Sequence, residues 1–216
     1  FFQLSACPSV GSCAFFGTAS TMQMLTEALG LAMPSAALIP AHLHALKESG
    51  RNAGEQILKL IEANIRPRDI VTQAALENAL ILHAATGGST NALLHLAAIA
   101  REAGLDFSYA QVNTINQRIP FLLNVKPSGR LNANMIWYAG GIYRIIRELQ
   151  DELNLDVMTV TGQTMGENLA QLEASGHFER MPWYLNNYQA KVEDIIASKN
   201  KPFRSKGAIQ ILFGNL

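Results

Sequence analysis

Several features are scarce in this sequence, and each absence excludes a class of protein. The 17 basic and 17 acidic side chains cancel, so no overall charge draws the chain to nucleic acid or to an anionic membrane. No apolar run approaches the roughly 20 residues that a membrane-spanning helix needs. The only two cysteines, Cys7 and Cys13, argue against a disulfide-stabilised secreted domain. We therefore expect a cytoplasmic protein that binds neither nucleic acid nor a membrane.

What the sequence does contain is enough apolar material for one substantial core, since 49% of its 216 residues are hydrophobic. The chain begins in an apolar segment at Phe1 and ends with a strand-like run at 208–213 followed by a glycine turn. These ends predict a piece of a longer chain.

Hydrophobic spacing and capping residues predict an α/β fold that is rich in helix. Two adjacent glycines, Gly140 and Gly141, predict a break in one helix or the close approach of another backbone there. Because helices alternate with short strands, we expect the strands to be parallel. Helices are expected at about 18–29, 42–64, 67–83, 89–101, 108–117, 134–153, 164–172 and 192–197, and strands at 121–125, 156–161 and 208–213.

Three turns rich in glycine or hydroxyl groups each precede an expected helix, at 11–18, 87–91 and 161–164. Helix N-termini expose unpaired N–H groups and carry a partial positive charge, so such turns suit an anion such as a carboxylate. Ordinary helix capping is the commoner explanation of any one of them. Three in one chain favour the convergence of some of them on a pocket.

Cys13 lies between small residues in the first of these turns. A helix start favours the thiolate, which binds soft metals and acts as a nucleophile. A lone cysteine is also often a small buried hydrophobic residue. Two other side chains leave similar alternatives open, because His83 and Lys126 could reach a pocket or serve as an interior histidine and a solvated lysine.

Longer motifs add a resemblance that spacing alone does not provide. The segments "ACPSVGSCAFFGTASTMQMLTEALGLAMPSAALIPA" (6–41) and "HAATGGSTNALLHLAAIAREAG" (83–104) resemble the dihydroxy-acid and phosphogluconate dehydratase family. The match continues in order through "LNVKPSG" (123–129), "AGGI" (139–142), "TVTGQTMGENL" (159–169) and "ILFGNL" (211–216). The sequences at 83–104 and 160–169 are most similar to the sugar-acid branch of this family, in particular the D-xylonate dehydratases.

This resemblance implies an iron–sulfur cluster, [2Fe–2S] or [4Fe–4S], held by three cysteines with one open iron, and a nearby Mg²⁺. Cys13 matches the family's cluster cysteine, whereas Cys7 matches no ligand position and is expected to be structural. The other ligands and the catalytic base are expected in segments outside residues 1–216. The whole chain is then the later part of the N-terminal α/β domain of a larger two-domain enzyme whose C-terminal domain is rich in β-structure.

The implied activity is that of a hydro-lyase that converts a sugar-derived 2,3-dihydroxy acid into a 2-keto-3-deoxy acid. Thr18 and the turn residues Gly87, Gly88, Ser89, Thr90 and Asn91 are the candidates for substrate contact or for the surroundings of the cluster. The enzyme is expected to form a homo-oligomer, a dimer or a tetramer, and the isolated piece is expected to be inactive. Two alternatives remain, a branched-chain dihydroxy-acid dehydratase and a non-catalytic module that binds an anion.

Overall fold

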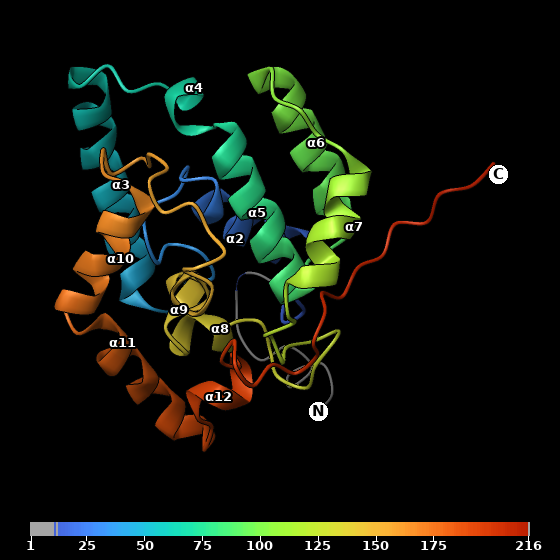
Figure 1. Cartoon of the computed structure of the whole chain (residues 1–216). Helices are drawn as coiled ribbons and strands as arrows, with labels where there is room; N and C mark the ends of the chain where they lie inside the picture. The colour runs from blue at the N-terminus through green and yellow to red at the C-terminus, as the bar shows by residue number, and fades with distance from the viewer. Residues whose placement is uncertain (1–10, 12, 216) are drawn as a thin grey trace.

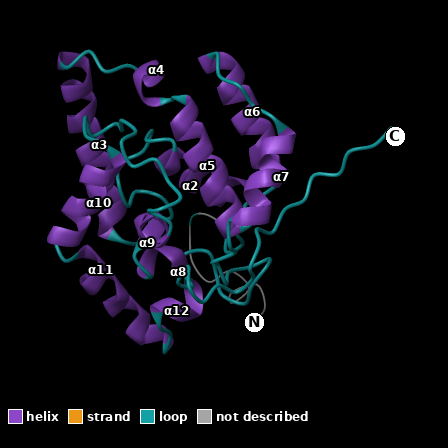
Figure 2. Cartoon of the chain, in the orientation of Figure 1, coloured by secondary structure: helices purple, strands orange, loops and turns teal. Residues whose placement is uncertain are grey.

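The computed structural model describes residues 11 and 13–215. Helices joined by loops make up this part of the chain (Figures 1 and 2). The elements are α2 (Thr18–Ala28), α3 (His44–Glu62), α4 (Pro67–Ile70), α5 (Gln73–Thr86), α6 (Asn91–Ala103), α7 (Tyr109–Arg118), α8 (Met135–Tyr138), α9 (Gly141–Glu148), α10 (Met165–Ala174), α11 (His177–Arg180), the 3₁₀ helix η1 (Met181–Tyr188) and α12 (Val192–Ile195).

Several expected helices are confirmed close to their expected bounds, and their ends show why. The hydroxyl of Ser108 accepts a hydrogen bond from the Ala110 N–H at 3.2 Å and so caps α7. Thr164 caps α10 by accepting from the Glu167 N–H at 3.1 Å. Gly104 ends α6 in the left-handed conformation, with φ +70°, which costs glycine little.

Two expected helices are each divided in the structure. The segment expected as one helix over 67–83 forms α4 and α5, because Thr72 caps a new helix and accepts the Ala75 N–H at 3.3 Å. The helix expected over 134–153 breaks at Gly140, whose φ is +112°. A Cβ at Gly140 would lie 3.3 Å from the Phe178 ring. The predicted break is therefore confirmed, whereas the atoms nearest to Gly140 belong to side chains and not to another backbone.

The expected parallel strands are not confirmed, because the described residues pair only through isolated bridges. The 121–125 segment bridges three different parts of the chain, in two cases antiparallel and only at Val125–Leu131 parallel. The 156–161 segment makes one antiparallel bridge, between Met158 and Thr164. The 208–213 segment is extended, and its Leu212 is 87% exposed. A strand needs a neighbour over several residues, and these bridges each involve one pair.

The core is built around α5, whose small and apolar side chains are buried on every side from Ala75 to Thr86 apart from Glu77. A helix that is apolar all round is stable only when neighbours cover all of it. Helices α2 and α7 pack against α5, and α2 also contacts α6 and α9. This packing brings the N-terminal ends of α2 and α6 together.

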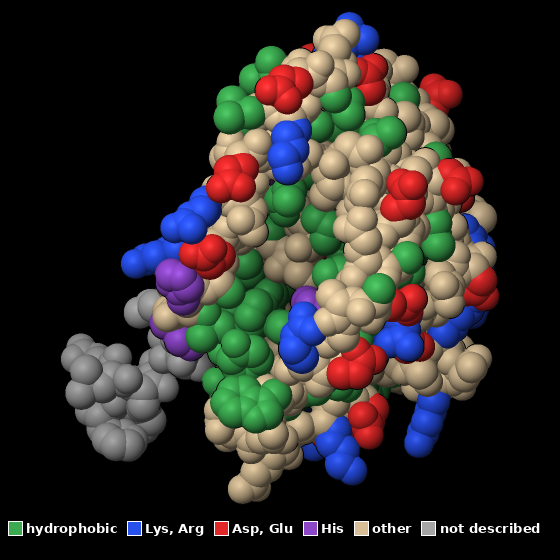
Figure 3. All heavy atoms as spheres, turned by 90° about the vertical axis from the view of Figure 1, so that its left-hand side faces the viewer, with side chains coloured by type: hydrophobic (Ala, Val, Ile, Leu, Met, Phe, Trp, Pro, Cys, Tyr) green, Lys and Arg blue, Asp and Glu red, His purple; other side chains and the backbone are tan. Residues whose placement is uncertain are grey.

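The surface on the α3 side is partly apolar. Figure 3 shows hydrophobic side chains gathered in a hollow on this face, with charged side chains around it. Among the exposed apolar residues of α3 are Ile57, Leu58 and Ile61. In the part of the chain that the structure describes, no helix has both the length and the hydropathy to cross a bilayer.

Candidate functional site

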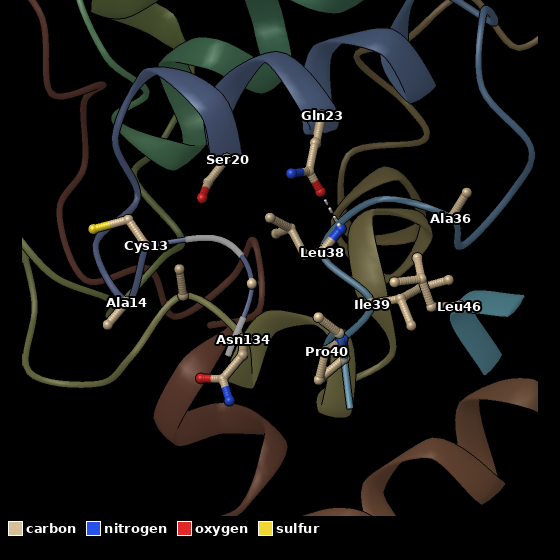
Figure 4. Close-up of a pocket in the computed structure, with 13 residues that line it drawn as sticks. Cys13, Ala14, Ser20, Gln23, Ala36, Leu38, Ile39, Pro40, Leu46 and Asn134 are labelled. Atoms are coloured by element: carbon tan, nitrogen blue, oxygen red, sulfur yellow. Dashed lines mark hydrogen bonds between the residues drawn. The ribbon is translucent and has the colours of Figure 1, made fainter. Parts of the chain in front are cut away.

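A cavity of about 360 Å³ lies between the segment before α2, the first turns of α2, the 36–41 segment and Asn134. Figure 4 shows Gln23 and Leu38 on one side of it and Cys13 on another. Cys13 is exposed, and its thiol points away from the other lining side chains in Figure 4. The sulfur is therefore accessible to a group that lies outside the described part of the chain.

Two backbone hydrogen bonds hold the chain next to Cys13, just before α2 begins. The Phe16 N–H donates to the Lys126 carbonyl at 2.7 Å, and the Ala133 N–H donates to the Ala14 carbonyl at 2.7 Å. The Phe15 N–H lies 3.5 Å from the Cys13 Sγ. The Cys13 loop is thus fixed against the 126–133 segment.

The first two of the three expected turns meet. Thr18 Oγ1 lies 3.1 Å from Ser89 Oγ, and the Asn91 side-chain amide donates to Thr18 Oγ1 at 2.9 Å. These contacts join residues that are about 70 positions apart in the sequence. The three side chains present two hydroxyls and an amide where α2 and α6 begin, which is a donor set suited to a carboxylate.

Gly87 and Gly88 are required by packing within the chain itself. Gly87 has φ +61°, and a Cβ there would lie 2.7 Å from the Phe121 ring. A Cβ on Gly88 would lie 2.7 Å from both His83 and Thr21. Both glycines are therefore needed whether or not a ligand approaches.

Most N–H groups of this turn already have partners in the chain. Those of Gly87 and Gly88 donate to the His83 carbonyl. The Ser89 N–H donates to Thr21 Oγ1 at 3.0 Å, and the Asn91 N–H donates to Ser89 Oγ at 3.3 Å. Contact between this turn and a substrate stays a prediction, since Thr18, Ser89 and Asn91 are hydrogen-bonded to one another and none of them lines the cavity.

His83 is an interior histidine. It is fully buried, and its Nε2 donates to the Ser89 carbonyl at 3.0 Å, since a carbonyl can only accept. Burial lowers the pKa of His83. Its Nδ1 has no hydrogen-bond partner among the described residues, as fits a neutral ring whose proton is on Nε2. His83 therefore supports the Ser89 turn from inside.

The third turn lies elsewhere. The Val160 N–H donates to the Gly30 carbonyl at 2.8 Å, which places the 160–164 region at the C-terminal end of α2. An 11-residue helix is about 16 Å long, so this turn is distant from Thr18. Thr164 is engaged in a capping box with Glu167, and this turn is explained by capping.

Sequence reasoning missed two polar residues on α2, Gln23 and Glu27. Glu27 is 1% exposed, and burial raises its pKa to about 8. Both side chains accept hydrogen bonds from the backbone of the 35–38 segment, part of which lines the cavity. Local spacing gave no clear signal, because Ser20, Gln23 and Glu27 lie on one face of the helix and interrupt its apolar side chains.

The described residues fit one ligand position of an iron–sulfur cluster and no more. Cys13 offers an accessible thiol, while Cys7 lies outside the described residues. No group of three histidine, cysteine or acidic side chains that could hold a metal ion occurs in the described ranges. Lys126 donates to Asn132 Oδ1 at 3.2 Å, and so has a partner within its own loop.

Comparison with known proteins shows which family the sequence matches. The sequence model of a family described as dihydroxy-acid/6-phosphogluconate dehydratase N-terminal matches residues 2–168. Similar curated proteins include a dihydroxy-acid dehydratase of Caldanaerobacter subterraneus subsp. tengcongensis, 39% identical over 214 residues, which are 98% of this chain and 36% of that protein. Dihydroxy-acid dehydratase 2 of Mesorhizobium japonicum is 42% identical over 214 residues, 98% of this chain and 34% of that protein. The chain thus spans about a third of the length of the curated relatives it matches.

Proposed function

Because this chain belongs to the dihydroxy-acid/6-phosphogluconate dehydratase family, we propose that it is part of a hydro-lyase that removes water from a 2,3-dihydroxy acid. The observation that carries the proposal is the position of Cys13. Cys13 lines a cavity of about 360 Å³ five residues before α2 begins, and its accessible thiol points away from the other lining side chains (Figure 4). Hydroxyl and amide groups gather where α2 and α6 begin.

In the proposed reaction the C2–H and C3–O bonds of the substrate break, water leaves, and the resulting enol becomes a 2-keto acid. When bound, an iron–sulfur cluster with an open iron supplies a Lewis acid for the departing hydroxide. Cys13 would hold such a cluster as a thiolate. Loss of the C2 proton places negative charge on the substrate carboxylate. The side chains of Thr18, Ser89 and Asn91 would stabilise that charge by donating hydrogen bonds. The described residues contain no group of three histidine, cysteine or acidic side chains that could hold Mg²⁺, and we assign it no step here.

For the substrate we propose a sugar-derived acid. The motifs at 83–104 and 160–169 resemble the sugar-acid branch, and a hydroxylated chain would find polar groups of Ser20, Gln23 and Asn134 on the cavity wall. Asn134 Oδ1 is buried and has no hydrogen-bond partner among the described residues. The second candidate is a branched-chain dihydroxy acid, which the apolar side chains of Leu38, Ile39 and Pro40 favour.

The test is a substrate comparison with the full-length protein, purified without oxygen. We expect formation of a 2-keto acid from a five-carbon sugar acid, measured by trapping the keto group, with kcat/KM above that for a branched-chain 2,3-dihydroxy acid. The reverse order of kcat/KM would select the second candidate. Absence of product from both acids, with an intact iron–sulfur cluster present, would refute the dehydratase proposal.

A further inference from the structure

The 35–38 segment has an unusual backbone. Ser35 and Leu38 adopt the left-handed region, with φ of +64° and +65°, which L-residues other than glycine rarely occupy and which persists only when neighbouring contacts enforce it. Leu38 lies on the wall of the cavity, beside Ile39 and Pro40 (Figure 4). The shape of this wall therefore depends on what holds the segment.

Two side chains of α2 hold the segment from one side. Glu27 Oε1 accepts the Ala37 N–H at 2.5 Å and Glu27 Oε2 accepts the Ser35 N–H at 3.3 Å. One turn earlier, Gln23 Oε1 accepts the Leu38 N–H at 2.9 Å. Residues four positions apart lie on the same helix face, so α2 presents both side chains to the segment.

Side chains from the other direction hold Ser35. Trp137 Nε1 donates to the Ser35 carbonyl at 3.1 Å, and the Ser35 hydroxyl lies 3.1 Å from His177 Nε2. These contacts fix the start of the segment. At its other end, beside the cavity, the Ala37 N–H donates to Glu27 and the Leu38 N–H donates to Gln23. Among the described residues, no other side chain accepts a hydrogen bond from these two N–H groups.

We propose that Glu27 is a positioning residue of the active site: its carboxyl group fixes the backbone at 35–37 and so sets the place of the Leu38–Pro40 wall that faces the substrate's carbon chain. This inference rests on the proposed dehydratase function. Glu27 contacts no reacting atom, and it acts through the wall.

The environment of Glu27 supports this role. A carboxyl group that is 1% exposed is costly to bury unless its oxygens are hydrogen-bonded. Both oxygens of Glu27 are bonded, and both bonds go to the 35–37 backbone. The other titratable group that faces it is Tyr143 of α9, which the charge of Glu27 affects. An apolar residue would suffice for packing alone, so the acceptor pair is what this position requires.

The experiment uses the full-length protein with Glu27→Gln and Glu27→Ala. Glutamine keeps one acceptor but turns an NH₂ group toward a backbone N–H, and alanine removes both acceptors. We expect KM for the preferred acid to rise about fivefold or more with a smaller change in kcat, and the ratio of kcat/KM between the two acids of the substrate comparison to change by a similar factor. Iron and sulfide content should equal that of the wild type.

The matched control is Asn78→Ala. Asn78 is also 1% exposed and also binds a loop backbone, accepting the Asn154 N–H at 2.9 Å, but it lies outside the cavity. Its loss should lower the melting temperature without changing the substrate ratio. Amide hydrogen exchange provides a second readout, because exchange at Ser35, Ala37 and Leu38 should quicken in both Glu27 variants and not in the control.

If Glu27→Ala fails to fold, Glu27→Gln decides. Folded Glu27 variants that keep the wild-type substrate ratio within about twofold, with unchanged exchange at 35–38, would overturn the inference while leaving the dehydratase proposal intact. An inactive wild-type protein with a complete cluster would instead overturn the proposed function, and the exchange data would still show whether Glu27 holds the segment.

Discussion

Cys13 combines accessibility with a fixed backbone. Its thiol is exposed, while the adjacent loop is tied to the 126–133 segment through Ala14 and Phe16. A thiol in this setting can reach a bound group without rearrangement of the chain. These properties favour a ligand over a packing residue, which would be buried.

Replacing Cys13 with serine in the full-length protein should therefore remove a cluster ligand. Serine is a harder and far less acidic ligand than cysteine, so we expect visible absorbance of the cluster and dehydratase activity to fall together, each by about tenfold or more. Absorbance spectra and steady-state kinetics measure both. Cys7→Ser is the control and should spare both, and equal effects at the two positions would contradict the assignment.

Glu27 also predicts a pH dependence of stability. Burial raises its pKa from 4.5 to about 8 in the folded chain, so between these values the folded state holds a proton that the unfolded state has lost. The contribution of Glu27 to stability is complete below pH 4.5 and is lost as pH rises through about 8. The pKa of Tyr143, the other titratable group that faces Glu27, is raised by burial, so Tyr143 stays neutral over this window.

We expect the free energy of unfolding of the wild type, relative to that of Glu27→Gln, to fall by a few kcal/mol, in order of magnitude, between pH 4.5 and 8. Chemical denaturation at several pH values gives this difference, since other titrating groups cancel between the two proteins. A difference that is constant with pH would show that Glu27 titrates normally.

At the scale of elements, the junction of α2 and α6 carries the substrate prediction. The double variant Ser89→Ala, Thr90→Ala in the full-length enzyme removes the hydroxyl that joins Thr18 and Asn91. If these groups bind the substrate carboxylate, kcat/KM should fall about tenfold or more, equivalent to about 1.4 kcal/mol of transition-state binding.

Kinetics beside a thermal melt separate this role from simple capping. Loss of a cap costs about 1 kcal/mol of stability and leaves the folded enzyme's catalysis alone. Thr164→Ala, which removes the cap of α10 at the far end of α2, shows that effect by itself. A lowered melting temperature with unchanged kcat/KM in the double variant would assign the junction to capping.

The elements that the sequence predicts well are those defined by neighbouring residues. Helices α3, α6, α7 and α10 follow from apolar spacing together with local caps such as Ser108 and Thr164. The strands expected at 121–125 and 156–161 do not follow, because a strand depends on a distant partner, and the bridges here involve single pairs. The meeting of Thr18 with Ser89 and the burial of Glu27 are likewise products of helix packing, which no local pattern encodes.

At the scale of the whole molecule, one candidate ligand is not enough for a cluster. Only Cys13 provides a thiol among the described residues, whereas the family resemblance implies three cysteines. We propose that residues 1–216 act as part of an N-terminal domain within a larger, homo-oligomeric enzyme.

Residues 1–216 expressed alone should therefore bind no intact cluster and show no turnover. The physical reason is that a cluster bound through a single protein thiolate is readily lost from the protein to other thiols in solution. Iron and sulfide analysis after anaerobic reconstitution measures the first expectation, and the 2-keto acid assay measures the second. The full-length protein treated identically is the control, and turnover by the isolated piece would contradict the proposed division.

Helix α2 connects three separate regions of the chain. Its first residue, Thr18, meets the Ser89 turn; Gln23 and Glu27 hold the 35–38 segment; and Gly30, just beyond its end, packs against the 158–160 backbone. A residue inserted between Thr18 and Gln23 would rotate the later side chains by about 100° relative to the first. After such a rotation, the contacts of Thr18 and those of Gln23 and Glu27 could not form at the same time. The number of residues in α2 is therefore fixed by the contacts that it makes along its length. Insertions that a surface loop would tolerate are excluded from this helix.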